Sequence, residues 1–308
     1  MKAVVIGAGH MGRYHADKLA GIPGVELAGV VDADRTRASE LAKKHGCPAF
    51  SNFREILSGK ADAAVIAVPT DRHHEVASAC LEHGMHVLVE KPIATSVEEA
   101  DALIALAERG KRVLQVGHVE RYSRAFRALA ERMDRPVFLE AERLSGFKQR
   151  GAEVDVVLDL MIHDLDLAAA LARAEVLDVS ACGFRVLTGE IDIANARIEF
   201  ANGCVANLSA SRVSQAPVRK LRVFQSDLYV SADLQKGSLR YVRRAAGGIE
   251  QAEERYEGGD ALAAQAQAFV SSITKQTPVE VGGVQGRKVL ALALDVGRLV
   301  RERLKRFE

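Results

Sequence analysis

A glycine-rich loop near the start of the chain constrains the fold most strongly. Gly7-Ala8-Gly9-His10-Met11-Gly12 directly follows the apolar segment Lys2–Ile6 and opens the helix-forming segment His10–Ala20. Glycines at this spacing allow a tight turn, and the backbone N–H groups that start the helix can face a pyrophosphate. The chain is therefore expected to begin with a strand, a phosphate-binding turn and a helix.

An acidic residue stands where a ribose-binding carboxylate is expected. Asp32 ends the next apolar segment, Val25–Val31, about 20 residues after Gly12. Its carboxylate can accept hydrogen bonds from two ribose hydroxyls and would repel a 2′-phosphate, which favours NAD(H) over NADP(H). Arg35 and Arg37 could soften that preference, or they could form a solvated helix face, and FAD and other adenosine ligands share this fingerprint. The candidate cofactor contacts from this region are Gly7, Gly9, His10, Met11, Gly12, Asp32 and Arg35.

The pattern of apolar runs predicts two domains of different class. Up to about residue 120, short apolar runs alternate with helix-forming segments, which is typical of a doubly wound parallel sheet, an α/β Rossmann domain. After about residue 135, several strands follow one another and alternate apolar with polar residues, which predicts an α+β domain with a mainly antiparallel, open-faced sheet. We expect residues 1–120 to bind the cofactor and residues 121–308 to bind substrate and form oligomers, with the last helix packing back toward the first domain.

Individual elements follow from the same patterns. The expected strands of the first domain are Lys2–Ile6, Val25–Val31, Ala61–Val68, His86–Val89 and Arg112–Val116. The expected helices are His10–Ala20, Arg35–His45, His73–Glu82, Val97–Arg109, Asp155–Arg173, Ala261–Thr274 and Val284–Leu304.

Composition argues against several classes of protein. Of 308 residues, 48% are hydrophobic and 27% charged, with a net charge of +1, which is typical of a globular chain and lacks the basic field of a nucleic-acid-binding protein. No apolar run is long enough to cross a membrane, and the N-terminal segment does not fit a signal peptide. The four cysteines are far apart without a metal-binding or disulfide pattern. We expect a cytoplasmic protein with no nucleic-acid, membrane or metal partner.

Glu90-Lys91-Pro92 is the first motif with a group capable of proton transfer. It follows the expected strand His86–Val89, and ligands of open α/β sheets bind beyond the carboxyl ends of the strands. A lysine there can exchange a proton with a substrate oxygen if burial or charge lowers its pKa, and a cis peptide before Pro92 would aim Lys91 in a fixed direction. An ordinary turn is the alternative for an isolated Lys-Pro pair.

The second such motif is an acidic stripe within Asp155–Arg173. Asp155, Asp159, His163 and Asp166 fall at i, i+4, i+8 and i+11, on one face of an otherwise apolar helix. A solvated stripe is the alternative, but such stripes usually carry Glu, Lys and Arg, which favour helices more than Asp and His do. Short acids one turn from an imidazole can orient it and stabilise its charged form, so the stripe is a candidate catalytic group.

In this order and over essentially the whole chain, the motifs resemble those of the Gfo/Idh/MocA oxidoreductase family. The family's Pro-Asn/Thr-x-x-His pattern appears as Pro69-Thr70-Asp71-Arg72-His73, beside Glu90-Lys91-Pro92 and the Asp-x-x-x-His-x-x-Asp pattern at Asp159, His163 and Asp166. The resemblance implies that Lys91 and His163 are catalytic and that Asp159 supports them in the substrate cleft. It further implies that the nicotinamide side is lined by Pro69, Thr70, His73 and Glu90.

One segment departs from the family's pattern. Many members carry a glycine cluster before the Asp–His motif, whereas this chain has Glu153-Val154-Asp155-Val156-Val157-Leu158. Taken together, this segment and the segments 117–122 and 142–150 are most similar to the branch of UDP-N-acetylglucosamine 3-dehydrogenases. This resemblance implies a sugar or nucleotide-sugar substrate. The candidate substrate contacts are Lys91, Arg121, Tyr122, Arg143, Asp155 and His163, and Lys148 and Arg150 are further cations able to meet a diphosphate or carboxylate.

The expected reaction is oxidation of a sugar hydroxyl, in a cleft between the domains. His163 or Lys91 would take the hydroxyl proton while hydride passes to the nicotinamide of NAD. The alternatives are an inositol or simple-sugar dehydrogenase, a reductase of another carbonyl compound, and a non-catalytic NAD-binding metabolite sensor. Lys91, Asp159 and His163 together favour catalysis, because a sensor needs no proton transfer. An open-faced sheet suits isologous contacts, so we also expect a homodimer or homotetramer.

Overall fold

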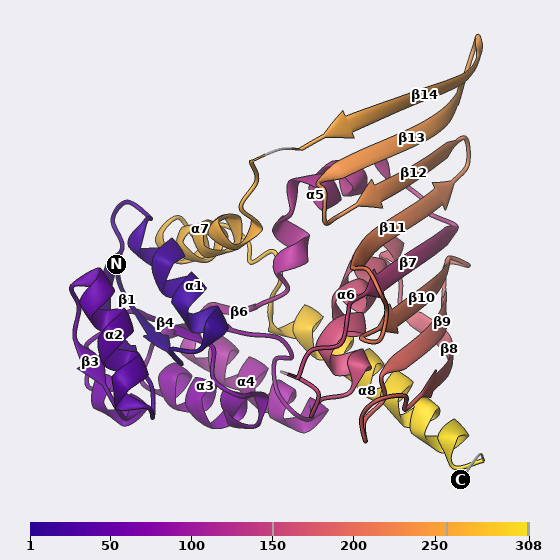
Figure 1. The fold of residues 1–308 in the computed structure, drawn as a ribbon. Coiled ribbons are helices and arrows are strands. Elements are labelled where there is room, and N and C mark those ends of the chain that lie inside the picture. Colours follow the sequence, from indigo (N-terminus) through magenta and orange to yellow (C-terminus); the bar gives the residue numbers. More distant parts are fainter. Residues whose placement is uncertain (150, 257, 307–308) are drawn as a thin grey trace. The chain divides into compact units, whose positions relative to one another are not determined.

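The computed structural model describes residues 1–149, 151–256 and 258–306 (Figure 1). The chain forms two compact units, Met1–Val119 with Asp260–Leu290, and Glu120–Gly259 with the segment from Ala291 onward. The sequence pattern changes near the same boundary. The sequence does not indicate, however, that the whole segment Asp260–Leu290 belongs to the first unit, because an amphipathic helix has the same pattern in either unit. Only the last helix is expected to pack toward the first domain.

The first unit contains a parallel sheet with strand order β3-β2-β1-β4-β5-β6, as predicted for a Rossmann domain. The order reverses between β1 and β4, the position at which doubly wound sheets bind ligands beyond the carboxyl ends of their strands. Its strands are β1 (Lys2–Ile6), β2 (Glu26–Val31), β3 (Ala49–Phe50), β4 (Ala63–Ile66), β5 (His86–Val89) and β6 (Leu114–Val116). Its helices are α1 (His10–Ala20), α2 (Arg35–His45), α3 (His73–Glu82), α4 (Val97–Gly110) and α7 (Ala261–Thr274), with the first part of α8 (Gly283–Leu304).

Burial explains why these strands are apolar without alternation. All residues of β4 are buried, and β5 is buried beyond its first residue, because helices cover both faces of the sheet. Helices α1 and α7 pack together, and Leu19 of α1 shares one core with Phe269 of α7 and with Val5 and Val30 of the sheet. Local signals set the helix ends: the Asp34 side chain caps α2 at its start, and Gly46, with a φ of 65°, ends it.

The second unit contains a sheet with strand order β14-β13-β12-β11-β7-β10-β9-β8. Strands β7 and β10 pair in parallel, and the other neighbours are antiparallel, so the predicted α+β class is confirmed. Strand β9 alternates exposed and buried residues, as expected when one face packs on helices. The strands are β7 (Phe138–Leu144), β8 (Val176–Phe184), β9 (Ile193–Phe200), β10 (Val205–Ser211), β11 (Val218–Gln225), β12 (Leu228–Asp233), β13 (Ser238–Ala245) and β14 (Gly248–Arg255).

Helices α5 (Arg124–Arg132) and α6 (Ile162–Ala172) pack on this sheet, α5 against β12 and β13 and α6 against β7 and β10. The expected continuous helix Asp155–Arg173 differs in its first part, where Val157–Met161 forms a π-helical turn before α6 begins. A π-turn places more residues in each turn than an α-helix, so the acids before and after it do not share one α-helical stripe.

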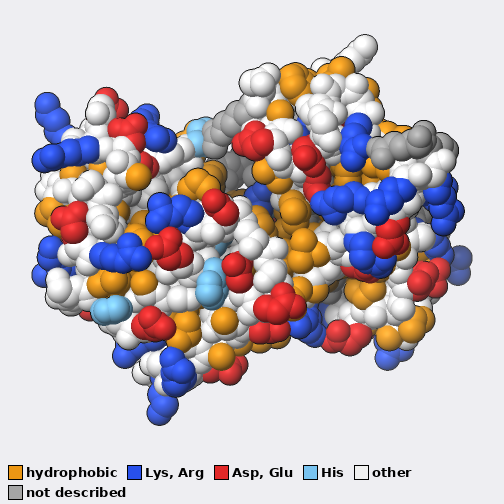
Figure 2. All heavy atoms as spheres, turned by 90° about the horizontal axis from the view of Figure 1, so that it is seen from below, with side chains coloured by type: hydrophobic (Ala, Val, Ile, Leu, Met, Phe, Trp, Pro, Cys, Tyr) orange, Lys and Arg blue, Asp and Glu red, His pale blue; other side chains and the backbone are white. Residues whose placement is uncertain are grey.

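Within the described residues, no helix has both the length and the apolar composition that a membrane crossing requires. Basic and acidic side chains are interspersed over the face shown in Figure 2, in keeping with the small net charge.

Candidate functional site

The glycine loop in the first unit combines two tight backbone contacts with one open position. A Cβ on Gly7, whose φ is +100°, would lie 2.4 Å from the Ala67 carbonyl oxygen, and a Cβ on Gly12 would lie 1.7 Å from the Gly7 carbonyl oxygen. Gly9 has nothing within 4 Å of its Cβ position, and it begins α1 without a side-chain cap. The loop therefore fits a pyrophosphate, which would approach the open side of Gly9 and the first N–H groups of α1.

Asp32 connects this loop to the end of β2. Its Oδ2 accepts the Ala8 N–H at 2.7 Å and its Oδ1 accepts the Asp34 N–H at 2.8 Å. Each carboxylate oxygen has a second lone pair, so Asp32 can hold the loop and still accept ribose hydroxyls. The residues present fit an adenosine dinucleotide.

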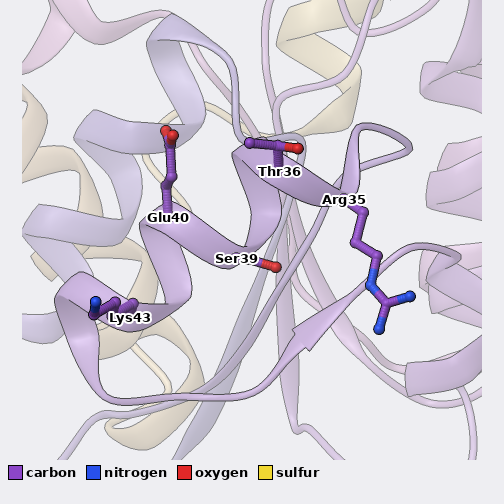
Figure 3. A pocket seen from close by; sticks show the side chains of 5 residues that line it. All are labelled: Arg35, Thr36, Ser39, Glu40 and Lys43. Atoms are coloured by element: carbon purple, nitrogen blue, oxygen red, sulfur yellow. The ribbon is translucent and has the colours of Figure 1, made fainter.

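The two arginines beside Asp32 have different surroundings. The Nε of Arg37 donates to the Asp34 carboxylate at 2.9 Å, whereas Arg35 is exposed at the end of a surface hollow along α2 (Figure 3). The other residues that line this hollow are Thr36, Ser39, Glu40 and Lys43 of the same helix. Of the two arginines, Arg37 is thus the one already paired with a carboxylate.

His73 connects the ends of β4 and β5. Its ring is only 1% exposed, with Nδ1 2.8 Å from the Pro92 carbonyl oxygen and Nε2 3.0 Å from the Val68 carbonyl oxygen. Burial lowers the pKa of His73, although both carbonyls and the nearby Glu90 act against that shift. A neutral imidazole donates one N–H, so His73 binds one of these two carbonyls and only contacts the other. It can act on a cofactor only through the backbone segments that it contacts.

Glu90 forms a buried pair that sequence reasoning missed. Its Oε1 lies 2.6 Å from Nε2 of His15 on α1, and its Oε2 accepts the Lys91 N–H at 3.2 Å. Burial raises the pKa of Glu90, but the His15 hydrogen bond, the His15 charge and the Lys91 charge outweigh it, so that the net shift is downward. The Lys91–Pro92 peptide is cis, and Lys91 is partly exposed beside this ionised carboxylate. In the sequence, the one indication of this pair is that His15 lies one helical turn after Gly12, on the helix that the glycine loop begins.

In the second unit, Asp159 and His163 are the partly exposed members of the acidic motif. Asp155 is buried, where its Oδ1 accepts the N–H groups of Val157 and Leu158 at 3.0 Å each. Asp155 therefore caps the π-turn. Its side chain is used for this contact, so the predicted contact with substrate would have to compete for the same carboxylate.

The other two acids of this helix bind arginines that we expected to contact substrate. Nε and Nη2 of Arg143 donate to the Asp164 carboxylate at 2.8 and 3.0 Å, and its Nη1 donates to Glu120 at 3.0 Å. Arg121 donates to Asp166 at 3.3 Å. Burial raises the pKa of Asp164 despite Arg143, whose own pKa is raised by both carboxylates against its burial.

Arg143 is only 4% exposed, so it acts as an internal counter-ion of α6 and is left out of our proposed substrate contacts. Tyr122 is also buried, with the Arg127 guanidinium 5.2 Å from its ring centre. Lys148 is exposed, and Arg150 lies outside the described residues.

Each unit thus brings together one set of the predicted residues. Gly7–Gly12, Asp32, Pro69–His73 and Glu90–Lys91 follow the carboxyl ends of β1, β2, β4 and β5, at one edge of the parallel sheet. Asp159 and His163 lie on the helix that packs against β7 and β10.

Comparison with known proteins agrees with this geometry. Residues 1–118 match the oxidoreductase family with an NAD-binding Rossmann fold, Gfo/Idh/MocA, and residues 129–230 match a Gfo/Idh/MocA C-terminal domain. The chain belongs to the Gfo/Idh/MocA oxidoreductase family. The predicted family, the fold class and the oxidoreductase activity are thereby confirmed.

Two relatives within the Gfo/Idh/MocA family show where the similarity is strongest. UDP-N-acetylglucosamine 3-dehydrogenase of Acidithiobacillus ferrooxidans is 42% identical over 99% of both chains, and its solved structure matches with a TM-score of 0.93 over 97% of both. Scyllo-inositol 2-dehydrogenase (NAD(+)) of Bacillus subtilis is 30% identical over 70% of this chain and 68% of its own. The similarity to the first relative therefore includes the whole substrate-side unit.

Proposed function

We propose that the protein oxidises a hydroxyl of a nucleotide sugar, the 3-hydroxyl of UDP-N-acetylglucosamine, with NAD as the hydride acceptor. The observation that carries the proposal is the 42% identity to UDP-N-acetylglucosamine 3-dehydrogenase over 99% of the chain. A shared cofactor domain alone would produce similarity restricted to the first unit. The open side of Gly9 and the Asp32 carboxylate beside the loop support a dinucleotide such as NAD in this position.

In this proposal, Lys91 and His163 move the proton of the reacting hydroxyl. Both side chains are partly exposed. Lys91 lies beside the Glu90 carboxylate, which accepts the Lys91 N–H, and His163 follows Asp159 by four residues in the second unit. A positioned acid–base group contributes roughly 10²- to 10⁴-fold to a rate. Bound NAD would supply the hydride acceptor, and the protein would hold the carbon and remove the proton.

NAD(H) is the preferred cofactor in this proposal. The Asp32 carboxylate is fixed by two backbone N–H groups, so it cannot turn away from a 2′-phosphate, whereas Arg37 is already paired with Asp34. Steady-state kinetics with both cofactors test the point, and a higher kcat/KM with NADP would overturn it.

The experiment that tests the function is a screen for NADH formation with UDP-sugars, free sugars and inositols. We expect turnover with UDP-N-acetylglucosamine, and turnover lower by about 10²- to 10⁴-fold in Lys91→Met and His163→Ala with NAD binding retained. Preferential oxidation of an inositol would favour the activity named for the 30% identical relative. NADH binding without oxidation of any compound would favour a sensor.

We further propose that the protein forms a homodimer or homotetramer through the open face of the second unit's sheet. The edge strand β8 carries exposed apolar side chains at both of its ends: Leu177, which is 72% exposed, and Phe184, which pairs in register with the exposed Ile193 of β9. A second copy of this chain is the occupant that such a self-complementary sheet face suits. Light scattering that shows a monomer at assay concentration would contradict this proposal.

A cytoplasmic location completes the proposal. The four cysteines are free thiols, and the pKa of the Cys80 thiol is raised by burial to about 12, which keeps it protonated and inert. Free buried thiols suit a reducing compartment. Recovery of the protein in a membrane or secreted fraction of its own cells would contradict this location.

A further inference from the structure

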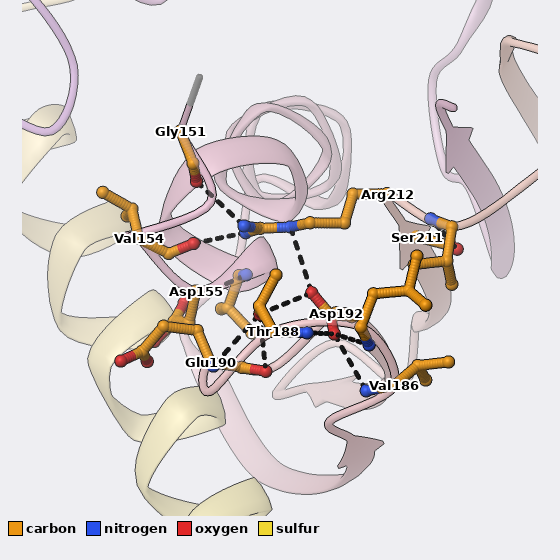
Figure 4. Close-up of polar contacts among 12 residues, drawn as sticks. Gly151, Val154, Asp155, Val186, Thr188, Glu190, Asp192, Ser211 and Arg212 are labelled. Carbon is orange, nitrogen blue, oxygen red and sulfur yellow. Dashed lines mark hydrogen bonds and ion pairs between the residues drawn. The ribbon is translucent and has the colours of Figure 1, made fainter. Parts of the chain in front are cut away.

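A buried arginine holds the segment that leads into the Asp159–His163 helix (Figure 4). Arg212 follows β10 and is only 4% exposed. Its Nη1 donates to the Gly151 carbonyl oxygen at 2.8 Å, and its Nη2 donates to the Val154 carbonyl oxygen. One guanidinium therefore bridges both ends of the turn Gly151–Val154, and a planar fork is needed to reach two carbonyls at once.

A fully buried carboxylate lies beside this arginine. Asp192 accepts the N–H groups of Val186, Leu187 and Thr188 at 2.8, 2.7 and 2.9 Å, and its Oδ1 lies 3.8 Å from Nε of Arg212. Burial raises the pKa of Asp192, but these hydrogen bonds outweigh it and lower the pKa to about 2. The Asp192 carboxylate therefore stays charged, and it places a negative charge from the loop between β8 and β9 beside the Arg212 guanidinium.

A second arginine holds the other end of the same segment. Nη2 of Arg301, on α8, donates to Oδ2 of Asp155 at 2.7 Å, while Oδ1 of Asp155 caps Val157 and Leu158. A Cβ on Gly151 would lie 3.5 Å from Oδ2 of Asp159, which places the turn in contact with that carboxylate. The backbone from Gly151 to Leu158 is thus held from both ends directly before Asp159.

We propose that Arg212 and Arg301 are positioning residues that set the place of Asp159 and His163 by fixing the segment 151–158. The inference rests on the proposed role of His163 in proton transfer. Neither arginine needs to touch substrate, because each acts through the backbone or through Asp155. A π-turn departs from regular helical hydrogen bonding, so external contacts at its start decide how the residues within it point.

Arg301 offers the cleaner test because its side chain is 47% exposed and Asp155 keeps the N–H groups of Val157 and Leu158 as donors when Arg301 is replaced. We expect Arg301→Met to lower kcat about ten- to a hundred-fold with little change in the KM for NAD, since small misplacements of catalytic groups cost rates of this order. Arg301→Lys retains a cation for Asp155 and should restore much of the rate. Arg303→Met, an exposed cation on the same helix, is the matched control and should leave kcat unchanged.

Arg212→Lys tests the other end of the segment. The ammonium retains the charge beside Asp192 but lacks the planar fork, so kcat should fall as in Arg301→Met while the fold persists. Circular dichroism checks the fold of each variant. A lower melting temperature with wild-type kcat in both Arg301→Met and Arg212→Lys would show a purely structural role and overturn the inference.

A readout that needs no substrate separates this inference from the proposed function. In protein carrying isotope-labelled histidine, the imidazole signals of His163, assigned with His163→Ala, should shift in Arg301→Met and not in Arg303→Met. Unchanged His163 signals in Arg301→Met would overturn the positioning role. Wild-type turnover in His163→Ala would instead overturn the proposed function, whatever the signals show.

Discussion

Replacing either of two glycines in the loop by alanine is expected to have a different effect: Gly12→Ala should lower stability, and Gly9→Ala should weaken NAD binding. At Gly12 the new Cβ would lie 1.7 Å from the Gly7 carbonyl oxygen, whereas real Cβ contacts essentially never fall below 3.0 Å. The start of α1 and the loop must then separate by about 3.0 − 1.7 = 1.3 Å. Overpacking costs typically about 1–3 kcal/mol, and backbone on both sides of the contact places Gly12→Ala at the upper end.

Gly9→Ala has no such contact in the protein, because nothing lies within 4 Å of the Cβ position. Its cost without ligand is that of alanine at a helix start, about 1 kcal/mol or less. The same Cβ projects into the space that we assign to the pyrophosphate. We therefore expect Gly9→Ala to weaken NAD binding by at least about tenfold, or 1.4 kcal/mol.

Thermal unfolding and NAD titration of both variants separate the two effects. A loss of about 3 kcal/mol lowers the melting temperature by about 6–12 °C, so Gly12→Ala should show a shift of this order without ligand, and Gly9→Ala a much smaller one. Wild-type NAD affinity in Gly9→Ala would refute the assigned pyrophosphate position. A wild-type melting temperature in Gly12→Ala would refute the contact argument itself.

Three further substitutions test the charges. Asp32→Asn should shift the kcat/KM ratio toward NADP(H) by roughly tenfold, because removing one charge near a 2′-phosphate relieves about 1–2 kcal/mol of repulsion; an unchanged ratio would contradict this. Arg143→Met should cost about 3–5 kcal/mol in urea denaturation by leaving Asp164 buried without its hydrogen-bonded cation, while Glu120 retains Arg219 as a partner; a raised KM at wild-type stability would instead support Arg143 as a substrate contact. Since the pKa of Asp192 is lowered from 3.8 to about 2, its carboxylate stabilises the fold above about pH 4 and loses that effect as the pH falls toward 2. Asp192→Asn should remove this acid-dependent part of the denaturation curve, and an unaltered curve would count against the assigned network.

The residues of the first unit could be predicted because each follows the carboxyl end of a parallel strand. Gly7–Gly12, Asp32 and Lys91 are recognisable by their spacing from an apolar run, and parallel strands bring such ends to one edge of the sheet. The Glu90–His15 pair was not predictable in the same way. The pair joins residues 75 positions apart. A buried histidine on a helix has no sequence pattern that distinguishes it from other core residues, so its partner cannot be predicted.

The substrate-side unit shows the limit of patterns more clearly. Arg121 and Arg143 have the chemistry of phosphate ligands, and only the tertiary structure shows that both bind acids of α6: Arg143 from β7, and Arg121 from the turn before α5. Spacing placed Asp155 on one stripe with His163, but the π-turn and the cap on Val157 change its role. Residue type limits the possible partners of a charged group, and tertiary contacts choose among them.

We propose that the protein transfers hydride from carbon 3 of UDP-N-acetylglucosamine to NAD. The most direct test uses this nucleotide sugar with deuterium at carbon 3, NAD and the wild-type protein. We expect the NADH formed to carry the deuterium and Lys91→Met to form it about 10²- to 10⁴-fold more slowly. NADH without deuterium, or no NADH at all, would contradict hydride transfer from carbon 3.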